Sequence, residues 1–158
     1  MIILKNKGIT ILEIIIVISI TILIASIVTL NLSDFKRART LENATSEIIS
    51  LINKSRNNTI SSLNSSNYSI HFDSDKVVLF LGSTYDPNAI TNEVMVLESS
   101  LEIPISLGVS LNGGGSDIVF QKITGETNNY GTINIRLKTD INTYRTININ
   151  QLGVVSEN

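Results

Sequence analysis

The chain has 158 residues, of which 42% are apolar and 16% charged, and its formal net charge is −2. This length suits one small globular domain and one further segment, and the slightly acidic balance excludes a general affinity for polyanions. The chain contains no cysteine and a single histidine, His71, which excludes disulfides, cysteine–zinc sites and any site that needs two imidazoles.

The first predicted element is an apolar run, Ile9–Leu30, that follows a short basic leader, Met1–Gly8. A helix of this length reaches roughly 30 Å, the thickness of a bilayer's hydrocarbon core. Glu13 is the one charged residue in the run, and a carboxylate there costs on the order of 2.5–3.5 kcal/mol unless it is paired, protonated or near the interface. We therefore expect residues 9–31 to form a transmembrane helix in which Glu13 has a function.

Three interpretations of this run compete. A secretory signal peptide has an apolar region of about 7–15 residues and a small-residue cleavage site, whereas this run is longer and no clear site follows it. A plain membrane anchor fits the length but leaves Glu13 unexplained. The third interpretation rests on Gly8-Ile9-Thr10-Ile11-Leu12-Glu13, which resembles the cleavage and methylation motif of type IV prepilins and type II secretion prepseudopilins.

This resemblance implies a set of functional residues and partners. A prepilin peptidase would cut after Gly8 and methylate the new amine of Ile9, where the family usually has phenylalanine. Glu13 would then set the register of assembly against the Ile9 amine of a neighbouring chain, as a desolvated pair. The implied partners are other pilins or pseudopilins, the peptidase/methylase, an inner-membrane assembly platform and membrane lipid. The implied location is the bacterial inner membrane, with the globular domain outside the cytoplasm and an extracytoplasmic filament after assembly.

An amphipathic helix is predicted next, over residues 32–62. Apolar residues recur three and four positions apart, which is one stripe of a helix. No proline occurs before Pro87, so one continuous helix from about Thr10 to about Ile60 is allowed. The stripe comprises Leu32, Phe35, Ala38, Leu41, Ala44, Ile48, Leu51 and Ile52. It needs a sheet to cover it.

Residues 63–158 are predicted to form that sheet, as a small antiparallel β domain. Tyr68–Phe72 and Val77–Leu81 flank a polar turn and predict a hairpin. Ile103–Leu111 predicts a further strand, broken by Pro104, which suits a strand start or an edge.

The last predicted hairpin pairs 132–137 with 145–150 around a turn at 139–142. Apolar and polar residues alternate along both strands, which predicts one buried and one solvated face. The buried face comprises Ile133, Ile135, Leu137, Ile147 and Ile149.

The second half of the chain carries another resemblance. Its elements, together with Phe120, Gly125, Gly131 and Leu152-Gly153-Val154-Val155, are similar to the GspH/FimT minor pseudopilins. The resemblance implies a pilin-like α+β fold, in which a long N-terminal helix, half transmembrane and half amphipathic, packs on the sheet. It also implies a structural subunit at or near the tip of a type II secretion pseudopilus or a type IV pilus.

Two other functions remain open. Some pilins that resemble this group bind DNA, and Arg136, Lys138 and Arg145 are placed where they could cluster. Residues 151–158 contain no lysine or arginine, so the basic footprint is thin and we do not expect nucleic acid as a partner. A simple membrane-anchored or secreted β domain is the other alternative.

We expect no enzyme, catalytic residue, metal or cofactor. His71 has no second imidazole and is interpreted as a packing or surface residue. Asp73 and Asp75 suit a turn better than a calcium loop, because the rest of a ligand set is missing. Gly113–Gly115 lacks the Lys-Ser/Thr of a phosphate loop and is interpreted as a turn.

Overall fold

The computed structural model describes residues 8–61 and 66–158, with side chains described except over residues 27–34. The chain divides into two compact units, residues 1–38 and 39–158. Helix α1, Ile11–Ile60, contributes to both. Its uninterrupted course agrees with the proline-free sequence.

The second unit contains the last part of α1, a short helix α2 and two antiparallel sheets. The first sheet has the strand order β3-β2-β1-β6, and the second has β4-β7-β8-β9 with β5 also paired to β7. The strands of the first sheet are β1 Tyr68–Phe72, β2 Lys76–Leu81, β3 Glu93–Val96 and β6 Asp117–Val119. Those of the second are β4 Leu101–Glu102, β5 Val109–Leu111, β7 Gly131–Leu137, β8 Asp140–Ile149 and β9 Val155–Glu157.

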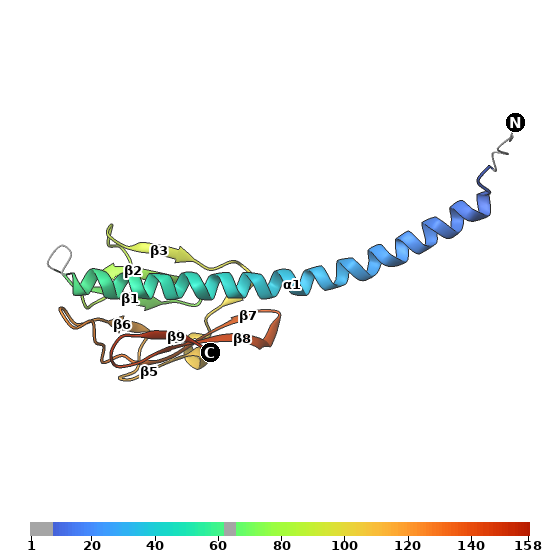
Figure 1. Ribbon diagram of the computed structural model, residues 1–158. Coiled ribbons are helices and arrows are strands. Elements are labelled where there is room, and N and C mark those ends of the chain that lie inside the picture. Colours follow the sequence, from blue (N-terminus) through green and yellow to red (C-terminus); the bar gives the residue numbers. More distant parts are fainter. Residues whose placement is uncertain (1–7, 62–65) are drawn as a thin grey trace, which may run out of the picture. The chain divides into compact units, whose positions relative to one another are not determined.

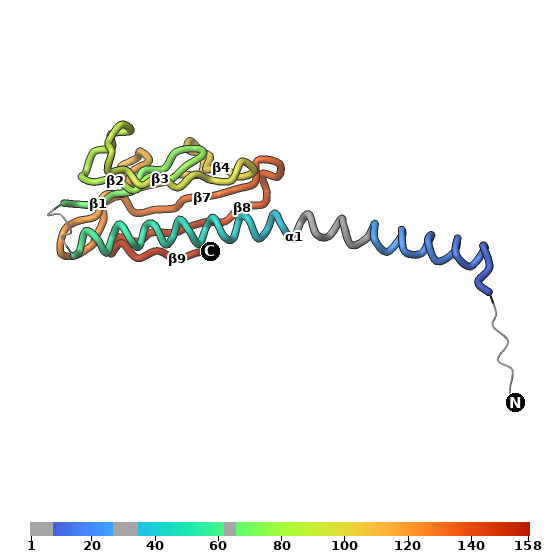
Figure 2. The backbone as a smooth tube through the Cα atoms, turned by 90° about the horizontal axis from the view of Figure 1, so that it is seen from above, coloured from blue at the N-terminus to red at the C-terminus, as the bar shows by residue number. Residues whose placement is uncertain are grey.

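The core of this unit lies between α1 and the two sheets, which run alongside the helix in Figures 1 and 2. The predicted stripe supplies the helix side from Leu41 onward, where Leu41, Ile48 and Ile52 are buried. Its earlier members Phe35 and Ala38 are exposed, which corrects the prediction, and the side chain of Leu32 lies outside the described residues. The predicted dry face of the last hairpin is also confirmed, with Ile133 opposite Ile147 and both fully buried. Alternation of burial along β7 and β8 therefore places one face on the core and the other in solvent.

The predicted fold class is wrong in two respects. In the part of the chain that the structure describes, no helix combines the length and the hydropathy that crossing a membrane requires. The expected transmembrane half packed beside a sheet is therefore not seen. In addition, the strands form two sheets instead of one small sheet. The fold that the structure supports is α+β with two antiparallel sheets.

Proline changes the predicted strand over 103–111. Pro104 has no N–H to continue a ladder, and it precedes α2, Ile105–Gly108. The chain makes one short helical turn and then returns to the same neighbour, because β4 and β5 both pair with β7. Of the strand predicted over 103–111, only β5 is a strand, because α2 occupies residues 105–108 and β4 ends at Glu102, before the predicted range.

The turn of the last hairpin is shorter than predicted. It consists of residues 138–139, and β8 begins at Asp140. A register shift between Arg136 and Leu137 adjusts the pairing beside it, as a β-bulge does.

Candidate functional site

The first candidate site is the start of α1, where Gly8, Ile9 and Thr10 precede the helix and are exposed. The Glu13 amide donates a hydrogen bond to Thr10 Oγ1 at 3.2 Å, and the Ile14 amide donates to the Thr10 carbonyl at 3.3 Å. Thr10 is therefore the N-cap, and Glu13 occupies the third helical position. A Thr-x-x-Glu sequence at a helix start is the capping-box pattern. The capping role of Thr10 was not predicted, although the Thr-x-x-Glu spacing in the sequence indicates it.

The expected cleavage residue and the expected register residue lie on the same side of this helix. Ile9 and Glu13 line a shallow hollow together with Ile14, Val17 and Ile18. Residues three and four apart are neighbours on a helix surface, which brings Glu13, Val17 and the residues after each of them to one side, and Ile9 lies just before the N-cap at this end. A negative charge in the first turn is also favoured by the helix dipole. Glu13 thus belongs both to the capped first turn, through its amide, and to an apolar surface.

That apolar surface extends around the whole helix over residues 11–26. Its large apolar side chains are exposed, from 48% at Ile14 to 80% at Ile11. The large apolar side chains are Ile11, Leu12, Ile14, Ile15, Ile16, Val17, Ile18, Ile20, Ile22, Leu23 and Ile24. A helix that is apolar on all sides is stable when something covers it. This segment therefore requires an apolar environment that the described chain does not supply.

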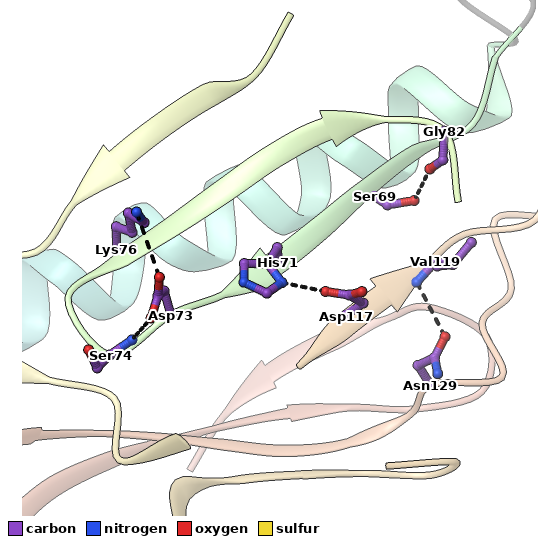
Figure 3. Close-up of polar contacts among 9 residues, drawn as sticks. All are labelled: Ser69, His71, Asp73, Ser74, Lys76, Gly82, Asp117, Val119 and Asn129. Atoms are coloured by element: carbon purple, nitrogen blue, oxygen red, sulfur yellow. Dashed lines mark hydrogen bonds and ion pairs between the residues drawn. The ribbon is translucent and has the colours of Figure 1, made fainter. Parts of the chain in front are cut away.

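The second candidate lies on the face of the first sheet that points away from the core cluster, around His71. Its Nδ1 lies 2.5 Å from Asp117 Oδ1, and its ring stacks on Tyr85 with centroids 3.9 Å apart (Figure 3 shows the His71–Asp117 pair). Phe80 also contacts the Tyr85 ring, at 5.4 Å between centroids. These contacts attach the loop after β2 to the sheet, so His71 is a packing residue, as predicted.

Nucleophilic chemistry has no support at this pair. Ser69, the hydroxyl residue two positions along β1, donates its hydrogen bond to the Gly82 carbonyl at 2.6 Å (Figure 3). A catalytic triad requires the serine hydroxyl to be hydrogen-bonded to the imidazole of the histidine. The Asp117 partner was not predicted, because only the pairing of β1 with β6 brings it opposite His71.

Turns account for the acidic and glycine-rich loops. Asp73 Oδ1 accepts the Ser74 amide at 2.8 Å, and the Asp73 amide donates to the Lys76 carbonyl at 2.9 Å (the side chains appear in Figure 3). Gly113–Gly115 forms the turn between β5 and β6. Among the described residues, no three His, Cys, Asp or Glu side chains are close enough to hold a metal ion.

The three cations of the last hairpin each have a protein partner. Arg136 Nη2 lies 2.6 Å from Glu102 Oε1, Lys138 Nζ donates to the Ser99 carbonyl at 3.0 Å, and Arg145 Nε lies 3.7 Å from Glu157 Oε1. Two of the three charges are thus opposed by carboxylates. The hairpin offers little positive charge to phosphates, on which nucleic-acid affinity depends.

Comparisons with known proteins give no further information. No protein-family model, curated protein or solved structure matches the chain.

Proposed function

We propose that the chain is a structural subunit of a pilus-like filament, a minor pseudopilin of a type II secretion system or a minor pilin of a type IV pilus. The observation that carries the proposal is the exposed apolar surface of residues 11–26, in which Glu13 is the one charged residue. Apolar area of this extent is costly in water, at about 25 cal/mol per Å². A filament of neighbouring helices covers such a surface, and membrane lipid covers it before assembly.

The second support is the chemistry at the helix start. The peptide bond after Gly8 lies in exposed, non-helical chain, which a peptidase can reach. Cleavage there would leave an ammonium at Ile9, on the side of the helix that carries Glu13. Within an apolar filament either charge alone is strongly unfavourable, so the amine and a carboxylate must be paired. Pairing between neighbouring subunits fixes their axial register.

The first test is the intact mass of the full chain isolated with and without a co-expressed prepilin peptidase. Loss of residues 1–8 and a methyl group on the Ile9 amine support the proposal. A chain that stays uncut in the presence of an active peptidase refutes it. Removal of the whole apolar run would instead identify a secreted β domain.

The second test separates the two roles of Glu13. Glu13→Gln keeps the capping box, because glutamine serves at that position, but it removes the charge. Thr10→Ala keeps the charge and removes the cap, at a cost of about 1 kcal/mol. We expect Glu13→Gln to be processed yet absent from sheared filaments, and Thr10→Ala to be incorporated. If Thr10→Ala is lost and Glu13→Gln is retained, Glu13 acts as a cap residue and the register role is wrong.

A further inference from the structure

The outer face of the second sheet carries a hollow of about 410 Å³. Strands β7 and β8 form its floor, through Thr132, Asn134 and Thr146. Pro104 and Leu107, from the start of α2, form one wall, and Ile141 and Tyr144 of β8 line the hollow as well. Its volume lies in the range of small-molecule sites, roughly 300–1,000 Å³.

The floor is polar and uncharged at its centre. Asn134 and Thr146 are opposite each other in the β7–β8 register, and Thr146 Oγ1 donates to Asn134 Oδ1 at 2.7 Å. This bond uses the hydroxyl proton of Thr146. The amide N–H groups of Asn134 and the lone pairs of Thr146 are thus what this pair offers a ligand, together with the hydroxyl of Thr132.

The one cation in the hollow is neutralised inside the protein. Arg136 directs both Nε and Nη2 to Glu102 Oε1, at 2.7 and 2.6 Å, and both side chains are about three-quarters buried. The pair therefore presents no net charge to an incoming group. A phosphate, an acidic peptide or a nucleic acid gains no electrostatic attraction here.

The edge of the hollow is apolar and includes an aromatic ring. Tyr144 is 57% exposed, Ile141 62% and Leu107 81%. Tyr144 lies opposite Arg136 in the register. A large exposed aromatic side chain next to uncharged hydroxyl and amide groups combines a flat apolar surface with hydrogen-bonding partners.

We propose that this hollow binds a neutral saccharide. Sugar hydroxyl groups both donate and accept hydrogen bonds, which matches the floor, and the C–H face of a sugar ring packs against a tyrosine ring. A purely apolar ligand fits less well, because it would bury the amide and hydroxyl groups without partners. The proposal does not depend on filament assembly.

The test uses the full-length chain in a detergent without a sugar headgroup, such as lauryldimethylamine oxide. The probes are the trimer of N-acetylglucosamine, cellotriose and maltotriose. The chain has no tryptophan and four tyrosines, so a fluorescence change that is present in the unmodified chain and lost in Tyr144→Ala reports on Tyr144 without tryptophan background, and calorimetry gives the affinity. We expect at least one probe to bind with Kd of about 1 mM or tighter.

Variants locate the binding. Tyr144→Ala, an exposed position, should weaken binding about tenfold, and the near-isosteric Thr146→Val about threefold or more. Asn148→Ala, on the same strand but outside the hollow, should leave binding unchanged, and circular dichroism checks that each variant is folded. The proposal is overturned if no probe binds at about 10 mM. It is also overturned if Tyr144→Ala binds normally, or if an anionic heparin fragment binds while the neutral probes do not.

Discussion

Gly153 packs where Arg56 of α1 contacts two loops, and its replacement by alanine gives the sharpest test of the fold. Its φ is +71°, and an added Cβ would lie 2.2 Å from the Gly125 carbonyl oxygen and 2.9 Å from Arg56 Nε. Arg56 Nε donates to the Gly125 and Leu152 carbonyls at 3.2 and 3.3 Å. The methyl group therefore cannot be accommodated unless these contacts separate.

The matched control is Gly114→Ala. Gly114 has nearly the same φ, +74°, but no described heavy atom lies within 4 Å of the added Cβ. The control therefore costs only the left-handed backbone, about 1 kcal/mol. Gly153→Ala also weakens the charge-assisted bonds of Arg56, about 1.5–3 kcal/mol, which gives a total near 3 kcal/mol.

Thermal unfolding of the full chain in detergent, followed by circular dichroism, measures the difference. At about 2–4 °C per kcal/mol for a chain of this size, we expect Tm to fall by roughly 6–12 °C in Gly153→Ala and by about 2–4 °C in Gly114→Ala. Equal shifts in the two variants would refute the reasoning, because they would mean that Arg56 does not hold the two loops.

Other substitutions test the packing of α1 on the sheets, each by equilibrium unfolding in denaturant. Thr59→Val should cost about 1–3 kcal/mol, because the fully buried Thr59 hydroxyl has its single proton within reach of the Ser55 and Tyr68 carbonyls, both at 3.0 Å, and accepts the Tyr68 amide. Ser55→Ala, one turn earlier, should be neutral or stabilising, because Ser55 Oγ is buried with no partner among the described residues; a loss above about 1 kcal/mol would contradict this. Ile52→Ala should cost about 2–5 kcal/mol by opening a cavity in the core. Lys54→Ala should lower the free energy of unfolding by less than about 1 kcal/mol, because the Lys54–Glu93 pair is half exposed. A loss as large as that of Ile52→Ala would contradict this.

The periodicity of apolar residues predicted those features that depend on a single helix or strand and not on the elements packed against it. The three-and-four spacing of Leu41, Ile48 and Ile52 identified the face of α1 that is buried, because a helix turns every 3.6 residues whatever lies beside it. Alternation identified the buried side of β7 and β8 in the same way.

Pairing between distant strands was beyond these patterns. The alternation of apolar and polar residues indicates which side of a strand is buried, but it does not indicate which strand pairs with it. Strand β1 pairs with its neighbour β2 and also with β6, which brings Asp117 to His71 across 46 residues of sequence. The division into two sheets follows from such pairings, so one sheet was predicted where two exist.

The hollow on the second sheet could not be predicted from local residue patterns, because it forms only when distant strands pair. In the sequence, the alternating Thr132, Asn134 and Thr146 indicate an ordinary solvated face, and Pro104 indicates a broken strand. In the structure, β4 and β5 both pair with β7, so the chain between them must rise from the sheet as α2. That rise places Pro104 and Leu107 beside the polar floor and converts a flat face into a hollow. Pro104 interrupts the strand, and the same interruption creates the wall of the hollow in which we propose that a ligand binds.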